Sequence, residues 1–333
     1  MRILVVGDYR TGTGPANVTK SYLACLPEDT LKQKCTGKCS RIFEILYQVI
    51  RADIVLCSGY SGQNIPAIKW AHILHKPAVY LMHGCVEHEN TINGVPDTRM
   101  NGIERQTLKL SDAIIAVSAQ FANWLWEHYP EYMDKIEYVT NGVDWVGLKA
   151  LQAEEIREPD RIMSIGGGMP RKMIRYICEA INHLNQTEKM NLKLTVIGDT
   201  GHDTQEIDSY PFVENKGLVS FDETVRMLYQ SKLYIQNSCF ETFGLAPLEA
   251  FACGCDLLLS SQIGARFIFK ALTSDDIIHD YSDSEEIAEK IKSVLQQGNN
   301  ERLQTGIDKE STSWEARTKQ LLELLQRVIE KNI

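Results

Sequence analysis

The stretch from Asn237 to Gly254, NSCFETFGLAPLEAFACG, decides the fold, because the residues on either side of it are typical of buried strands. Lys232–Gln236 is a short apolar run before it, and Asp256–Ser261 is a second one after it. Within the stretch, a loop precedes Pro247, which suits the first turn of a helix, and Gly254 suits the end of that helix. A strand, a loop, a helix and a strand in this order form a βαβ unit, so the sequence predicts a parallel sheet.

The start of this helix is predicted to lie at the edge of the sheet where ligands of parallel α/β proteins bind. Unpaired N–H groups there, at the positive end of the helix dipole, can hold a phosphate without a cationic side chain. Glu241 and Glu249 flank this point, and since a carboxylate repels phosphate, we expect both to accept hydrogen bonds from sugar hydroxyls. The pattern indicates a nucleotide sugar as the ligand. The alternative, a loop cap and an exposed helix glutamate, is common for a lone pair of glutamates.

The string ETFGLAPLEAFACG closely resembles the motif of the retaining, nucleotide-sugar-dependent family-4 glycosyltransferases, which have the GT-B fold. Other segments are similar to the same family in the same order: RILVVGDY from Arg2, HG at His83 and Gly84, SDAIIAVSAQFANWL from Ser111, NGVD from Asn141, IGGGMPRK from Ile165 and LTVIGD from Leu194. The resemblance implies an α/β protein with two doubly wound, Rossmann-like domains that face a central cleft.

Strand-like and helix-like segments alternate along the chain, which agrees with a doubly wound α/β fold. Between Leu26 and Arg51 there is little room for a strand and a helix, so we expect an abbreviated first sheet. The polar segment Leu148–Asp160 predicts the domain junction. We therefore expect an N-terminal, acceptor-side Rossmann-like domain at residues 1–152 and a nucleotide-sugar-binding one at 153–312. The resemblance implies that a C-terminal helix at 313–333 packs back on the first domain.

The composition of the 333-residue chain excludes several classes of protein. No apolar run approaches the about 18 residues of a membrane span, and the N-terminus lacks the pattern of a signal peptide, so we expect a cytoplasmic location. Residues 1–150 hold 15 basic and 15 acidic residues, so the whole net charge of −9 lies beyond them, and we expect no nucleic-acid partner. Nine scattered cysteines indicate reduced thiols, and none has the spacing of a zinc site.

One basic stretch stands out in the first half. Lys32, Lys34, Lys38 and Arg41 precede the apolar run IFEILYQVI. A basic segment beside an amphipathic helix predicts peripheral contact with anionic lipid at the inner face of a membrane, or with a diphosphate-linked acceptor. The alternative is a solvated entry to an ordinary helix.

The first glycine-rich loop, GDYRTGTGPAN from Gly7, lies between a predicted strand and a predicted helix. It is a weak dinucleotide fingerprint, because Asn17 stands where the third glycine belongs. It can also be a simple tight turn. The resemblance implies that Gly12, Thr13 and Gly14 approach the donor phosphates.

The second glycine-rich loop, IGGGMPRK, departs from the family pattern. The family has an arginine at the position of Gly167 and a lysine at that of Lys172, and the two cations neutralise the departing diphosphate. Here only the lysine is present, with Arg171 as a partial replacement. Loss of one cation predicts leaving-group stabilisation weaker by about 2 to 4 kcal/mol.

His83 follows the apolar strand PAVYLM at the edge where ligands gather. It can be structural, whereas the resemblance implies a place near the transferred sugar. The resemblance also implies a front-face mechanism that needs no metal and no cofactor, with Lys172, Glu241 and His83 as catalytic residues. The acidic pair Asp275 and Asp276 is expected to be exposed rather than to hold a metal. The implied donor-binding residues are Gly12, Thr13, Gly14, Arg171, Lys172, Glu241, Thr242, Phe243, Gly244, Leu245 and Glu249.

The function that the sequence predicts is transfer of a hexosyl unit from a nucleotide sugar, UDP-sugar rather than GDP-sugar, to a hydroxyl of a glycan or lipid-linked acceptor. Two alternatives stay open. One is a binding or regulatory subunit with impaired catalysis, because the arginine is missing at Gly167. The other is a sugar-nucleotide epimerase.

Overall fold

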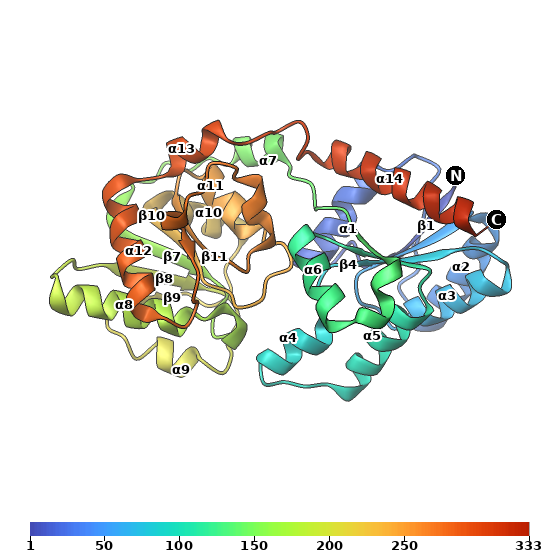
Figure 1. The fold of residues 1–333 in the computed structure, drawn as a ribbon, viewed down its shortest axis with the longest axis horizontal. Helices are drawn as coiled ribbons and strands as arrows, with labels where there is room; N and C mark the ends of the chain where they lie inside the picture. The colour runs from blue at the N-terminus through green and yellow to red at the C-terminus, as the bar shows by residue number, and fades with distance from the viewer. Residues whose placement is uncertain (333) are drawn as a thin grey trace. The chain divides into compact units, whose positions relative to one another are not determined.

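The computed structural model describes residues 1–332, apart from the side chain of Lys38. The chain forms two units, each built on its own six-stranded parallel sheet (Figure 1). The first unit comprises Met1–Asn90, Pro96–Val143 and the residues from Lys309 onward. The second comprises Asp144–Asp308 with the short segment Thr91–Val95. This architecture confirms the expected α/β fold with two Rossmann-like units.

The first sheet has the strand order β2-β1-β3-β4-β5-β6, and every neighbouring pair is parallel. Its four central strands are buried along their whole length, because helices flank both faces. The strands are β1 (Ile3–Gly7), β2 (Leu31–Lys32), β3 (Ile54–Ser58), β4 (Ala78–Met82), β5 (Ala113–Ala116) and β6 (Ile136–Tyr138). The expected abbreviation is confined to β2, which has two residues.

The helices of the first unit follow these strands in the usual alternation. Three of them begin with side-chain caps, where Asp97, Ser118 and Ser313 accept hydrogen bonds from backbone N–H groups of the first turn. The helices are α1 (Gly14–Cys25), α2 (Lys38–Arg51), α3 (Asn64–Ile73), α4 (Val86–Ile92), α5 (Thr98–Leu110), α6 (Ala119–His128), η1 (Pro130–Lys135) and α14 (Trp314–Lys331).

The C-terminal helix α14 packs on α1 within the first unit (Figure 1). The ring of Trp314 meets that of Tyr22 edge to face, with the ring centres 5.0 Å apart. The segment before the helix is fixed as well, since Val143 N donates to Thr312 O at 2.9 Å. A glycine is needed at position 142, because a Cβ there would lie 2.5 Å from the Cα of Trp314.

The second sheet has the order β12-β11-β10-β7-β8-β9 and is also parallel throughout. Its strands are β7 (Glu158–Ile165), β8 (Lys193–Ile197), β9 (Val213–Asn215), β10 (Ser231–Gln236), β11 (Asp256–Ser260) and β12 (Ile277–Ile278). The helices are α7 (Trp145–Ala150), η2 (Pro170–Lys172), α8 (Ile174–Thr187), α9 (Thr204–Ile207), α10 (Phe221–Gln230), α11 (Ala246–Ala252), η3 (Gly264–Ile268), η4 (Ser274–Asp276), α12 (Ser284–Gln297) and α13 (Asn300–Thr305).

The register of the second sheet brings four loops to one edge. Strand β10 lies between β7 and β11, with Leu233 opposite both Ile162 and Asp256. Because all strands run in the same direction, the loops that follow β7, β8, β10 and β11 emerge together at their carboxyl ends. The second glycine-rich loop and the Glu241 turn are therefore neighbours.

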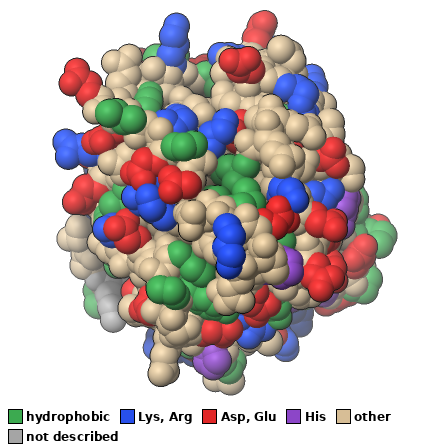
Figure 2. Space-filling model, turned by 90° about the vertical axis from the view of Figure 1, so that its left-hand side faces the viewer, with side chains coloured by type: hydrophobic (Ala, Val, Ile, Leu, Met, Phe, Trp, Pro, Cys, Tyr) green, Lys and Arg blue, Asp and Glu red, His purple; other side chains and the backbone are tan. Residues whose placement is uncertain are grey.

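The structure also bears on the surface charges, on membrane spans and on the cysteines. On the face drawn in Figure 2, acidic and basic side chains are interspersed. Within residues 1–332, no helix combines the length and the apolar character that crossing a membrane requires. None of the nine cysteines forms a disulfide within residues 1–332.

Candidate active site

The candidate site begins at the turn between β10 and α11. Helix α11 has Pro247 in its first turn and ends at Ala252, shortly before Gly254, whose φ of +84° suits glycine. The turn before the helix is held from the side by the segment after β11: Gly264 N donates to Glu241 O at 3.2 Å and Ala265 N to Phe243 O at 2.7 Å.

This turn exposes unbonded backbone donors. The N–H groups of Phe243, Gly244 and Leu245 have no hydrogen-bond acceptor within the described part of the chain. Gly244 has a φ of +88°, a conformation that a side chain would strain. The side chains of Thr242 and Phe243 are buried, so the turn offers its backbone rather than these side chains.

The carboxylate of Glu241 forms the centre of a charged cluster. Its Oε2 accepts from Lys172 Nζ at 2.5 Å and lies 3.5 Å from Arg171 Nη1. Gln236 Nε2 donates to the same oxygen at 3.0 Å, and Tyr234 in turn donates to Gln236. Burial opposes the charge, but the two cations hold the pKa of Glu241 below its usual value.

The other oxygen of Glu241, Oε1, makes no hydrogen bond to any described residue. Lys172 and Gln236 thus fix the orientation of the carboxylate through one oxygen. The second oxygen remains as an acceptor for a ligand.

Glu249 lies in a different environment. Its half-buried carboxylate has no hydrogen bond or ion pair with the residues that the structure describes. Burial raises its pKa. Burial raises the pKa of the Tyr234 hydroxyl, and the charges of Glu249 and Glu241 raise it further. Both carboxylates therefore lie near this hydroxyl. The two glutamates are thus neighbours of one residue but differ in the direction of their pKa shifts and in their partners.

The second glycine-rich loop, after β7, is closely packed. Gly166 N and Gly167 N both donate to Ile197 O, at 2.8 and 2.9 Å. Gly167 has a φ of +56°, and a Cβ there would lie 2.0 Å from Asp199 O. The position where the family has an arginine is closed to any side chain in this conformation.

The same loop delivers the two cations to the Glu241 turn. It ends in the short helix η2, and Cys239 N donates to Arg171 O at 3.0 Å, which ties the loop to the segment after β10. The side chain of Lys172 crosses Gly166, where a Cβ would lie 2.4 Å from its Cγ. The structure thus brings together Arg171, Lys172, Glu241 and the turn at Gly244, which are far apart in sequence.

The remaining predicted residues belong to the first unit. His83 follows β4, and its Nε2 is 2.9 Å from Ser58 Oγ, which is 2.8 Å from Thr19 Oγ1 on α1. Burial lowers the pKa of His83 to about 4, so the ring is neutral near pH 7. A Cβ at Gly59 would meet His83 at 3.0 Å and Pro15 at 4.0 Å, so His83 and the end of the first glycine-rich loop lie close to one point.

The first glycine-rich loop is open. Thr13 is the N-cap of α1 but makes no side-chain capping bond. Gly12 has a φ of +77°, and a Cβ at Gly12 or Gly14 would meet nothing within 4 Å. Neither glycine is required by packing.

Glu104, which no sequence motif indicates, positions the segment after His83. Its buried carboxylate accepts from Val86 N and Glu87 N, both at 2.9 Å, and so caps α4. Burial raises its pKa. Gln236 was missed as well. A polar residue at the end of an apolar strand is the only signal that could have indicated it.

The structure also shows the surroundings of the acidic pair Asp275 and Asp276 and of the basic stretch. Asp276, expected to be exposed, is buried and accepts two hydrogen bonds from Arg302, because it fastens η4 to α13. Within the described residues no group of three or more His, Cys, Asp and Glu could hold a metal. In the basic stretch Lys32 and Lys34 are exposed and Arg41 is half-buried, while the side chain of Lys38 lies outside the described residues.

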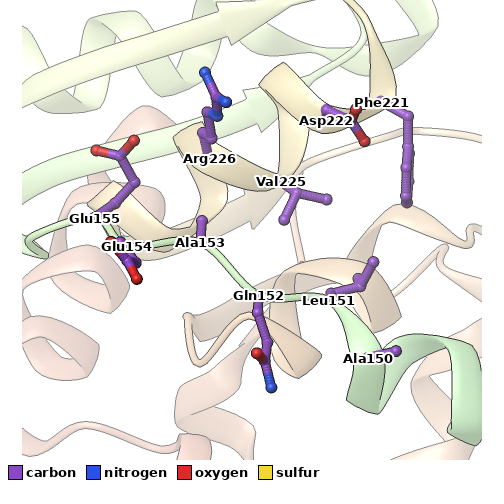
Figure 3. A pocket seen from close by; sticks show the side chains of 10 residues that line it. All are labelled: Ala150, Leu151, Gln152, Ala153, Glu154, Glu155, Phe221, Asp222, Val225 and Arg226. Carbon is purple, nitrogen blue, oxygen red and sulfur yellow. The ribbon is translucent and has the colours of Figure 1, made fainter.

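A pocket of about 500 Å³ lies elsewhere in the second unit, between the segment after α7 and α10 (Figure 3). Leu151, Phe221 and Val225 give it an apolar part, and Glu154, Glu155 and Arg226 a charged one. None of the predicted donor-binding residues lines it.

Comparison with known proteins finds a matching family model for each half of the chain. The model described as Glycosyltransferase Family 4 matches residues 28–145, and that described as Glycosyl transferases group 1 matches residues 150–312. The chain is 23% identical over 222 residues to a glycogen synthase of Mycobacterium tuberculosis, covering 63% of this chain and 52% of that one. It is 23% identical over 240 residues to a probable sucrose-phosphate synthase of Thermosipho melanesiensis, covering 67% and 56%. The chain thus matches about half the length of these curated relatives.

Solved structures share the fold at low identity. Anabaena HepE in complex with UDP has a TM-score of 0.71 and 13% identity, with 98% of this chain and 100% of that chain covered. Sucrose-phosphate synthase from Thermosynechococcus elongatus has a TM-score of 0.63 and 15% identity, with 99% of each chain covered. The family models, which together span both units, and this shared architecture lead to one conclusion: the chain belongs to the family-4 glycosyltransferases of the GT-B fold.

Proposed function

We propose that this glycosyltransferase moves a hexosyl unit from a UDP-sugar to a hydroxyl of a glycan or lipid-linked acceptor, with retention of configuration and without a metal. The observation that carries the proposal is the arrangement at the carboxyl edge of the second sheet. There Lys172, Arg171 and Glu241 meet a turn with three unbonded backbone N–H groups. HepE, which shares the fold, was solved with UDP and with UDP-glucose, and this supports UDP as the nucleotide.

Each group receives a role that its surroundings support. The N–H groups of Phe243, Gly244 and Leu245 would hold the diphosphate, and Lys172 would stabilise its charge as the sugar leaves. The open Oε1 of Glu241 would accept from a sugar hydroxyl. Glu249, which has no partner in the described chain, would bind the ribose diol. The proposal also assigns Gly12, Thr13, Gly14 and His83 to substrate binding.

The proposed step is a front-face substitution. The bond from the anomeric carbon to the phosphate oxygen breaks while a bond to the acceptor oxygen forms on the same face, and the acceptor proton passes to the departing phosphate. The protein then supplies position and charge rather than a general base. A neutral His83 fits this scheme as a hydrogen-bonding group.

Two substitutions separate chemistry from binding. We expect Lys172→Ala to lower kcat about 100-fold or more, because the developing charge on the leaving group loses its cation, with a smaller change in donor affinity. We expect Glu249→Ala to weaken donor binding by roughly 10- to 100-fold. Initial rates and isothermal titration measure both, with Lys270→Ala as a control for loss of an exposed charge. Wild-type values in both variants would refute the proposed site.

A donor panel identifies the nucleotide. Thermal shifts and hydrolysis rates with UDP-, GDP- and ADP-sugars, each with and without EDTA, should show the largest stabilisation with a UDP-sugar and no effect of EDTA. Loss of activity in EDTA would contradict the metal-free mechanism. Binding without any hydrolysis or transfer would favour the regulatory alternative.

We also propose that the outward side of α2 contacts an anionic membrane or a lipid-linked acceptor. Phe43, Tyr47 and Ile50 are 72%, 61% and 57% exposed on this helix. Its one acidic residue, Glu44, is occupied by hydrogen bonds from Lys34 N and Cys35 N, both at 2.8 Å. The exposed side chains of Lys32 and Lys34 lie in the segment before this helix. Co-sedimentation with phosphatidylglycerol vesicles should be lost in Phe43→Ser/Tyr47→Ser. Unchanged sedimentation of that variant would refute the contact.

A further inference from the structure

We propose that Arg266 is a further cation of the donor site, beside Lys172 and Arg171, and binds the diphosphate together with Lys172. This inference rests on the proposed function and names a residue that the sequence motifs do not indicate.

Arg266 lies in η3, the short helix that follows β11. The two residues before it are hydrogen-bonded to the donor turn, Gly264 N to Glu241 O and Ala265 N to Phe243 O at 2.7 Å. Glu241 and Ile263 also pair as an isolated parallel bridge. The backbone at Arg266 is therefore held directly beside the turn with the unbonded N–H groups.

The guanidinium of Arg266 has no anionic or hydrogen-bonding partner within residues 1–332. Its Nε is buried, and its described contact is with the ring of Phe267, 4.6 Å from Cζ. Burial lowers its pKa, in agreement with the absence of an anionic partner among the described residues. Leaving a half-buried guanidinium unpaired is costly unless a ligand supplies the anion.

The other half-buried arginines of the second unit behave differently. Each donates to an oxygen atom of the protein: Arg157 to Cys253 O, Arg161 to Glu214, Arg171 to Phe240 O, and Arg175 to the hydroxyl of Tyr176. Among the half-buried arginines of the second unit, only Arg266 donates no hydrogen bond to a described residue. Its location beside the donor turn distinguishes it from an ordinary structural arginine.

A further cation suits the charge of the proposed ligand. Lys172 and Arg171 both contact the carboxylate of Glu241, which offsets part of their positive charge. A nucleoside diphosphate brings more than one negative charge. No cation can be placed at Gly167, where a Cβ would collide with Asp199 O. The planar guanidinium of Arg266 can bind two phosphate oxygens at once.

Isothermal titration of the full chain with UDP and with uridine tests the assignment. We expect Arg266→Gln to weaken UDP binding by roughly 10- to 100-fold and to leave uridine binding unchanged, because only UDP carries the phosphates. Arg266→Lys should keep part of the affinity. Lys270→Gln, which removes an exposed charge four residues away, is the matched control and should bind UDP like the wild type.

The outcomes are distinguishable. Failure of UDP, GDP and ADP to bind the wild type would refute the proposed function itself. Normal UDP binding by Arg266→Gln would overturn this inference alone, and a raised KM for a phosphorylated acceptor in that variant would show that Arg266 binds the acceptor instead. Equal weakening of UDP and uridine binding would show that Arg266 only supports the fold of the turn, and would likewise overturn the inference.

Discussion

The two glycine-rich loops occupy equivalent places in the two units, yet their glycines serve different purposes. Each loop follows the first strand of its sheet and precedes a helix, β1 to α1 in one case and β7 to α8 in the other. In the first loop, a Cβ at Gly12 or Gly14 would meet no other atom within 4 Å. In the second, a Cβ at Gly167 or Gly168 would lie 2.0 Å from its neighbour.

The difference shows that a glycine signature does not report one physical cause. The glycines of the second loop are required because this loop packs closely against the loop after β8, where Gly168 N donates to Asp199 O at 3.0 Å. Gly12 and Gly14 of the first loop are not needed for packing, so their backbone remains accessible to a ligand. The missing family arginine follows from this, since the packed loop has no space for a side chain at Gly167.

The largest effect is expected for Gly167→Arg. Restoring the family residue should destabilise the protein by about 3 kcal/mol or more and lower activity, because the new Cβ collides with a backbone carbonyl at a positive φ. Urea denaturation and initial rates measure this. In the control Gly14→Ala, stability should change by less than about 1 kcal/mol, since the space is open and alanine suits a helix start. A stable and faster Gly167→Arg enzyme would refute the packing explanation.

Acidification should lower the stability of the first unit. His83, linked through Ser58 to Thr19 on α1, has its pKa lowered by burial to about 4, against about 6.5 in an unfolded chain. The folded state therefore disfavours the proton, and its stability should fall by up to about 3 kcal/mol as the pH drops from about 6.5 to 4. The difference in unfolding free energy between wild type and His83→Gln, measured across this range, isolates the effect. A pH-independent difference would show that His83 is not desolvated.

The sequence predicted the parts of this molecule that depend on local pattern. Buried strands such as β1 and β4 are continuous apolar runs, and Pro247 and Gly254 mark the ends of α11, so these were confirmed. The two-residue strand β2 carries too few residues for any periodicity, and β7 begins at Glu158 inside a polar segment, because pairing with neighbouring strands overrides local propensity.

The site was predictable as a set of residues but not as a set of contacts. The motif indicated Glu241, Lys172 and Gly244, and the structure gathers them in one unit. That Lys172 binds Glu241, and that Arg266 lies beside the same turn, depends on the parallel register of β7, β10 and β11. Such long-range pairing leaves no signal in a single sequence.

A smaller effect is expected for Gly12→Ala. Since only the φ of +77° opposes a side chain there, the free energy of unfolding should fall by about 1 kcal/mol. Donor affinity should fall further if the loop binds phosphate through its backbone. Unfolding by urea and titration with UDP distinguish the two effects, and Gly94→Ala, at another open glycine with a φ of +72°, is the control for the backbone cost alone.

The smallest expected effect concerns Met173, at the end of the second loop. Met173 precedes α8 with a φ of +50° and a ψ of +31°, a left-handed conformation that costs a non-glycine residue about 1 to 2 kcal/mol. Met173→Gly should remove this strain but add backbone entropy to the unfolded chain, for a net stabilisation of up to about 1 kcal/mol. Met169→Gly, at a φ of −73°, should only destabilise. If both variants lost the same stability in urea, the second loop would not be strained at Met173, and its shape would follow from glycine packing alone.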